Sequence, residues 1–239
     1  QKNLISQLRY TGDQNEAFVK LGGDFQSVGL PGARQINRAA GTDQFTESPE
    51  QATSLVDKAL QSGLRLDIGL SGDLPNGGSY VIDGGLRTKD QDSRVSTIVD
   101  TVLTTVSFTP RADVTWQLGN HSHSSKIGID IYHANYDSDR KQDPDDPQFH
   151  RYNAQQTTLG IYMQDEFRIF DSLTVTGGVR STWVGFTAGD EINNNAPGGG
   201  FETDHDSTNQ TEQEHIYNIG GEYQLSPLLS VFARSGRAI

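Results

Sequence analysis

The chain of 239 residues contains no cysteine, which excludes thiol catalysis, cysteine-ligated metals and disulfide bonds. It also contains no run of about 18 apolar residues, so a transmembrane helix is excluded. Hydrophobic residues make up only 33% of the chain and the mean hydropathy is -0.59, which is low for a soluble protein that buries a deep core. Transmembrane β-strands fit these values, because half of their side chains face a polar lumen.

Basic residues are scarce as well. There are 19 Lys and Arg residues against 31 Asp and Glu residues, which gives a net charge of -12 and a pI near 4.8. Nucleic acid is therefore excluded as a partner, since phosphate binding needs a basic face. The 26 glycines favour strands and turns over helices.

What the chain does contain is alternation of apolar and polar residues. In residues 173–180, one face would carry Leu173, Val175, Gly177 and Val179, and the other would carry Thr174, Thr176, Gly178 and Arg180. A strand of this kind must place its apolar face against something. Little sequence is left over to cover many such strands, so we infer that the apolar face contacts lipid.

Ten segments carry this pattern and are expected to be strands. They are residues 3–11, 16–26, 63–74, 78–88, 96–117, 124–136, 156–169, 173–187, 214–225 and 229–236. In the sixth, for example, Ile127, Ile129 and Ile131 alternate with Gly128, Asp130 and Tyr132. The chain is therefore expected to be all-β.

Short turns and long polar loops alternate between the expected strands. The turns are residues 12–15, 75–78, 119–122, 170–172 and 226–227, and the loops are 27–62, 89–95, 137–155 and 188–213. This alternation predicts an antiparallel up-and-down transmembrane β-barrel with short periplasmic turns and long extracellular loops. Aromatic residues near the strand ends are candidates for interfacial girdles: Tyr10, Phe25, Trp116, Trp183, Tyr217 and Tyr223.

One hairpin of the chain resembles a known family. Residues 159–168 read LGIYMQDEFR and residues 173–180 read LTVTGGVR. The pair is similar to the strand G-x-Y-x-Q-D-E, short turn and strand L-T-x-x-x-G-x-R that the barrels of TonB-dependent outer-membrane receptors often carry. Residues 220–234 resemble the following hairpin of that family, and residues 18–34 and 128–140 resemble it more loosely.

The resemblance implies a function and partners. Receptors of this family take up a large, scarce solute, most commonly a ferric siderophore, across the outer membrane of a Gram-negative bacterium. The TonB–ExbB–ExbD complex drives uptake through a plug domain. We find neither a plug nor a TonB box here, so we expect residues 1–239 to be a partial barrel of about ten strands, cut from a barrel of about 22. Such a fragment alone should neither insert nor transport, because open sheet edges in lipid are costly.

Two other functions stay open on the sequence. A passive outer-membrane porin would need no plug and would fold a loop inward. A soluble or surface-attached β-protein used for adhesion would cover its apolar faces. Enzyme activity is not expected, because no G-x-S-x-G elbow or other catalytic arrangement is recognisable.

Candidate ligand sites are weak, and no catalytic, cofactor or metal residue is assigned; the substrate-binding residues are unknown. Of the six histidines (His121, His123, His133, His150, His205 and His215), His121 and His123 have a spacing that allows a shared metal, but a solvated turn is the better interpretation. The segment His150-Arg151-Tyr152 at the end of a loop is able to reach a ligand. The carboxylates in residues 137–146 are enough for calcium but lack EF-hand spacing, and residues 193–200 lack the Lys-Ser/Thr of a phosphate loop.

The polar faces of the expected strands carry charges of both signs. We expect these side chains to form a salt-bridged inner wall, to bind a plug or to contact solute. They are Lys20, Asp24, Arg65, Asp67, Asp83, Arg87, Arg111, Asp113, Arg180 and Glu222.

Overall fold

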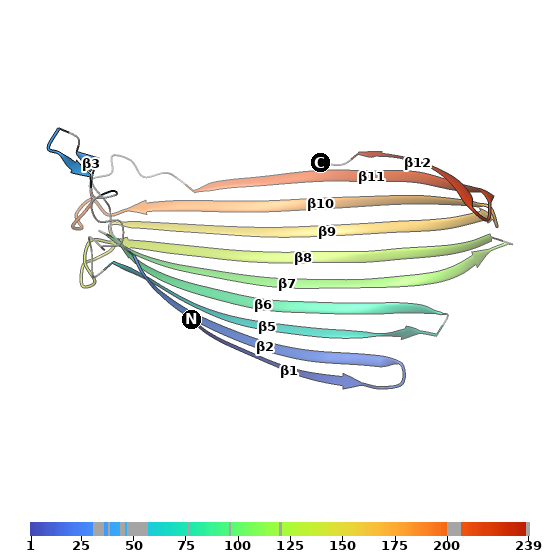
Figure 1. Cartoon of the computed structure of the whole chain (residues 1–239), viewed down its shortest axis with the longest axis horizontal. Helices are drawn as coiled ribbons and strands as arrows, with labels where there is room; N and C mark the ends of the chain where they lie inside the picture. Colours follow the sequence, from blue (N-terminus) through green and yellow to red (C-terminus); the bar gives the residue numbers. More distant parts are fainter. Residues whose placement is uncertain are drawn as a thin grey trace.

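The computed structural model describes residues 1–30, 36–37, 39–43, 46, 57–75, 77–95, 97–119, 121–199 and 207–237. Ten long strands lie side by side in one curved sheet (Figure 1). They are β1 (Lys2–Thr11), β2 (Asn15–Gly29), β5 (Lys58–Leu74), β6 (Gly78–Val95), β7 (Thr97–Leu118), β8 (His121–Lys141), β9 (His150–Phe170), β10 (Leu173–Ile192), β11 (Thr208–Ser226) and β12 (Leu229–Arg237). Two short strands, β3 (Ile36–Asn37) and β4 (Thr42–Asp43), form a separate hairpin. None of the described residues forms a helix long and apolar enough to span a membrane.

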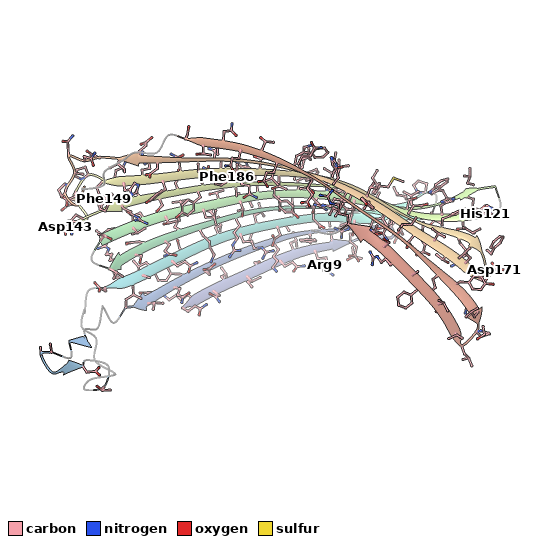
Figure 2. The ribbon with its side chains drawn as sticks, turned by 90° about the horizontal axis from the view of Figure 1, so that it is seen from above. Arg9, His121, Asp143, Phe149, Asp171 and Phe186 are labelled. Carbon is pink, nitrogen blue, oxygen red and sulfur yellow. The ribbon has the colours of Figure 1, made fainter. Side chains whose placement is uncertain are left out.

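The strand order in the sheet follows the chain. Each long strand pairs antiparallel with its neighbours in sequence, in the order β1-β2-β5-β6-β7-β8-β9-β10-β11-β12. All ten expected strands are present, so the up-and-down prediction is confirmed. Five short connections, residues 12–14, 75–77, 119–120, 171–172 and 227–228, define the turn end of the sheet. The opposite end, where Asp143 and Phe149 lie in Figure 2, is called the loop end.

The strand registers assign every side chain to one of two faces. Arg111, Gly128, Tyr162 and Arg180 are successive cross-strand partners on β7 to β10, so they share one face, which we call the inner face. Partners across an antiparallel pair point to the same side, and the faces alternate along each strand. Following these registers through the sheet places all ten charged residues of the expected inner wall on the inner face.

The opposite, outer face carries most of the large apolar side chains, and no described element packs on it. Ile127, Ile129 and Ile131 lie there, and so do Leu64 and Ile68, which are 60% and 50% exposed. Among the described residues the buried apolar side chains are only Ile98, Phe149 and Ala196. Within the described part of the chain, this sheet therefore has no second layer and no core of the kind that stabilises a soluble domain, and its apolar face requires an apolar solvent.

The strands are longer than expected at the loop end, and one expected loop is wrong. Residues 89–95 belong to β6, which continues to Val95 and connects to Thr97 through a single residue. The expected loops 27–62, 137–155 and 188–213 shrink to residues 30–57, 142–149 and 193–207. Polar composition suggested loops there, but a strand that extends past the bilayer has no need of an apolar face.

A transverse row of charges on the outer face marks where the apolar surface ends. Asp92, Asp100, Asp139, Arg151 and Glu191 are successive partners on β6 to β10 near the loop end. The 22 residues of β7 extend roughly 70 Å, far more than the ~25 Å apolar band of a membrane barrel, even allowing for strand tilt. The row lies beyond this band. There, the hydrogen bond to Asp139 and the charge of that carboxylate raise the pKa of Arg151 above its ordinary value.

Candidate functional site

A cluster of polar and aromatic side chains occupies the inner face at the loop end. It consists of Arg140 from β8, His150 and Tyr152 from β9, and Asp190 from β10. The rings of His150 and Tyr152 lie 4.0 Å apart between centroids, and the guanidinium carbon of Arg140 lies 5.0 Å from the centre of the Tyr152 ring. His150 Nε2 contacts the Asp190 carboxylate. The register brings these residues together, although 50 positions separate Arg140 from Asp190.

The two connections beside this cluster hold it in place. The backbone N–H of Phe149 donates to Arg140 O (2.9 Å), and the N–H of Asn193 donates to Phe149 O (3.0 Å). Phe149 and Ala196 are only 4% and 5% exposed, so these two side chains are packed where the described parts of the connections lie beside the strand ends. The half-buried side chains of Arg140 and Tyr152 present a cation and an aromatic ring that are suited to binding a polar solute, whereas His150 is only 3% exposed.

Only part of the expected ligand segment belongs to this cluster. His150 and Tyr152 point to the inner face, as a ligand contact requires, but both lie in β9 and not in a loop. Arg151 lies on the outer face, where its Nε donates to Asp139 Oδ1 (2.8 Å). Asp190 was missed in the sequence, because only the pairing of β9 with β10 places it beside His150.

Ion pairs along the inner face confirm the expected salt bridges for six of the ten charged residues. They join Arg65 to Asp67 (2.7 Å), Arg111 to Asp83 (3.3 Å), Lys126 to Asp113 (3.2 Å) and Arg180 to Asp130 (2.7 Å). The last pair links β10 to β8 across β9, where Gly160 leaves room for the guanidinium. Lys126 and Asp130 were not in the expected set, and the strand registers account for both of them.

The histidines near the β7–β8 turn lie in a strand, so the expectation of a solvated turn is wrong for His123. Its ring stacks between Trp116 and Phe167, with centroid distances of 4.1 and 4.4 Å, and it is 8% exposed. His123 Nδ1 lies 2.8 Å from Asp165 Oδ2. Across the described part of the chain, no group of three or more His, Asp or Glu side chains is arranged to hold a metal.

The described residues of the other two candidate ligand segments, 137–146 and 193–200, make contacts within the protein. Asp139 is paired with Arg151, and the backbone N–H of Asp143 donates to Asp146 Oδ2 (3.2 Å), so two of the carboxylates that were considered for calcium have partners within the protein. In the asparagine-rich connection, the N–H of Asn195 donates to Asn193 Oδ1 (3.1 Å). These donors serve the turns themselves and make no anion-binding cradle.

One serine and one histidine meet on the outer face, a pairing that the sequence did not reveal. Ser181 and His215 are cross-strand partners, with 2.8 Å between Ser181 Oγ and His215 Nδ1. The side-chain amide of Gln213 lies 3.1 Å from His215 Nε2, so both ring nitrogens of His215 have a polar neighbour on the outer face.

The match to a family model decides the family. The model of the TonB dependent receptor-like β-barrel matches residues 2–239. The chain belongs to this family. Since the family is one of receptors, the fold gives no support to enzyme activity. No curated protein sequence matches the chain significantly.

Solved structures of TonB-dependent receptors share the fold of this barrel segment. The ferric citrate transporter FecA in its unliganded form is 13% identical with a TM-score of 0.73, and covers 98% of this chain. The ferric-catecholate import receptor Fiu from E. coli K12 is 12% identical over 98% of the chain (TM-score 0.69), and the siderophore receptor PiuA from Acinetobacter baumannii is 10% identical over 97% (TM-score 0.68). The chain spans 35%, 42% and 41% of these three proteins, respectively.

Proposed function

We propose that this TonB-dependent receptor segment forms part of the barrel wall of a protein that takes up a ferric siderophore or a similar metal chelate across the outer membrane of a Gram-negative bacterium. In this proposal, residues 1–239 supply ten strands of a larger closed barrel, and a plug domain lies outside them. The TonB–ExbB–ExbD complex would act through that plug. Outer-membrane lipid would cover the outer face.

The observation that carries the proposal is the single sheet with an unpacked apolar face and an ion-paired polar face, in a chain that matches the family along its whole length. The structurally similar FecA and PiuA are described as a ferric citrate transporter and a siderophore receptor. These descriptions support an iron chelate as the solute class.

We assign solute contact to the cluster of Arg140, His150, Tyr152 and Asp190, with Arg140 and Tyr152 as the contacting side chains and the buried His150 as their support. It lies at the loop end, which would face the medium, and its side chains point to the inside of the barrel. Loops and strand ends held by a rigid scaffold are where binding residues concentrate. Its aromatic and charged groups can bind a chelate through stacking and hydrogen bonds.

Uptake by cells tests the proposal. A strain lacking the gene for this protein, grown under iron limitation, should lose accumulation of ⁵⁵Fe from one member of a panel of ferric chelates, and the restored gene should return it. Uptake should also disappear when TonB is deleted. If accumulation persists without TonB, the protein is a passive porin. If no chelate depends on the gene, the proposed solute class is wrong.

Adhesion is the remaining alternative, and the geometry does not favour it. A surface β-protein would cover its apolar face, whereas Leu64, Ile68 and Val179 are each at least half exposed. An adhesive protein would also remain folded without detergent. Loss of the folded state on detergent removal from the complete protein supports the membrane assignment.

A further inference from the structure

A polar and aromatic cluster interrupts the apolar outer face near the turn end, the end where His121 lies in Figure 2. The Asp165 cluster, as we call it, consists of Trp116 from β7, His123 and Ser125 from β8, and Asp165 and Phe167 from β9. Trp116, His123 and Phe167 are successive cross-strand partners, and Ser125 is the partner of Asp165. The registers therefore bring all five side chains to one patch of the outer face.

Hydrogen bonds hold the Asp165 carboxylate in one position. The Ser125 hydroxyl donates to Asp165 Oδ1 (2.5 Å) and accepts from Trp116 Nε1 (2.8 Å). His123, whose ring lies in the aromatic stack, places Nδ1 2.8 Å from Asp165 Oδ2. Ser125 and His123 are buried, whereas the Asp165 side chain is 28% exposed and Trp116 is 40% exposed. A buried, hydrogen-bonded support thus presents a carboxylate and an indole to whatever surrounds the sheet.

Within the described strands, no lysine or arginine on the outer face pairs with this carboxylate. Of the described residues in the ten long strands, Asp165 is the one outer-face Asp or Glu that does not lie at the loop end. The neighbouring Lys126 and Arg168 lie on the inner face. His123 Nε2 is buried and has no hydrogen-bond partner among the described residues, so a doubly protonated ring would leave a buried proton unsatisfied. The arrangement therefore favours a cation from outside the sheet at Asp165.

The position of the cluster along β9 identifies the surroundings of this carboxylate. Fourteen residues separate Asp165 from Arg151 in the transverse row of charges, which is roughly 46 Å along the strand and about 35 Å along the membrane normal at a tilt of about 40°. The apolar band takes up ~25 Å of this distance, and headgroups take up the rest. Asp165 therefore lies at the headgroups of the periplasmic leaflet, a depth that the amphipathic Trp116 side chain also favours.

We propose that the Asp165 cluster binds the ammonium headgroup of a phospholipid in the periplasmic leaflet. The ammonium group would donate to the Asp165 carboxylate, and the exposed part of the Trp116 ring would contact the same cation. Ser125 and His123 hold the carboxylate in place. A lipid phosphate is not the bound group, because the carboxylate repels it. The inference rests on the membrane location within the proposed function and not on the solute.

Lipid binding to the complete receptor tests the proposal. Native mass spectrometry of the detergent-solubilised receptor counts the molecules bound in titrations with phosphatidylethanolamine or with phosphatidylglycerol of the same acyl chains. Asp165→Asn should remove one bound phosphatidylethanolamine and leave the count of phosphatidylglycerol unchanged. The matched control is Glu166→Gln, which removes the next carboxylate along β9 at the same depth but on the inner face, and it should change neither count. Carbodiimide coupling of the unaltered receptor in vesicles of the two lipids is a second readout, and it should join the lipid amine to Asp165.

Three results would overturn the headgroup proposal. Asp165→Asn would bind as much phosphatidylethanolamine as the unaltered receptor, it would lose both lipids equally, which would show that the patch binds acyl chains only, or Asp165 would couple to a lysine of the protein, which would identify that side chain as the cation. Heat-modifiable migration confirms that each variant is folded. Lipid binding requires neither solute nor TonB, so loss of chelate uptake with retained lipid binding does not touch the headgroup site, and a failed headgroup site leaves the proposed solute class standing.

Discussion

The assignment of the outer face to lipid makes a quantitative prediction for Ile161 on β9. Its side chain points outward beside Ile129 on β8 and is 42% exposed. That fraction corresponds to roughly 75 Å² of apolar surface, or about 2 kcal/mol of transfer free energy at about 25 cal/mol per Å². In Ile161→Arg this term is lost and a cation is placed in the apolar band, where arginine costs about 2–4 kcal/mol.

The matched control is Thr158→Arg, three residues away on the same strand but on the inner face. The same side chain there contacts the polar wall, so the free energy of unfolding should change by less than about 0.5 kcal/mol. Urea titration of the complete receptor in phospholipid vesicles, followed by heat-modifiable migration, measures both. The two terms together cost about 4–6 kcal/mol, so Ile161→Arg should lower the folded-to-unfolded ratio about 700- to 20,000-fold. Equal effects of the two variants, or a larger effect of Thr158→Arg, would refute the assignment of the faces.

Three further predictions use the same receptor. Gly69→Val should destabilise the fold by about 1–3 kcal/mol in urea titration, because the added side chain meets the Phe18 ring, and an unchanged midpoint would contradict this packing. Arg180→Gln leaves the Asp130 carboxylate, which is 16% exposed, without its ion pair and should lower the free energy of unfolding by about 1–2 kcal/mol. Arg180→Lys should recover part of this loss. Equal urea midpoints for the two variants and the original protein would show that the pair contributes nothing. Tyr152→Ala should weaken chelate binding at least about tenfold in an equilibrium binding assay, while the free energy of unfolding stays within about 0.5 kcal/mol of the original. An unchanged affinity would remove Tyr152 from the solute site.

The alternation of side chains predicted the strands and faces well, because a sheet in contact with lipid must repeat its apolar face at period two. The isoleucines at 127, 129 and 131 are on the outer face as expected. The same criterion failed at residues 89–95, since Asp90, Asp92 and Arg94 lie on the outer face beyond the apolar band. Composition reports the solvent that a strand contacts, and here that solvent changes from lipid to water within one strand.

The candidate site depended on information that no local pattern contains. His150 and Tyr152 were noticed in the sequence, but Arg140 and Asp190 join them only through the registers of three strands. The like-charged partners Arg65 and Arg87 were both expected on the inner wall, yet their direct opposition follows only from the β5–β6 register. A shift of either strand by one residue would change these partners, so cross-strand chemistry is less readable from sequence than face assignment.

The agreement between strand order and chain order has a consequence for how such proteins diverge. Because each long strand pairs its backbone only with the long strands next to it along the chain, a hairpin can be inherited as a unit. A hairpin can be lengthened, duplicated or exchanged while the remaining pairs keep their register, and substitutions need only preserve the alternation. This tolerance of substitution accounts for the similar backbone of relatives whose sequences are only 10–13% identical to this chain.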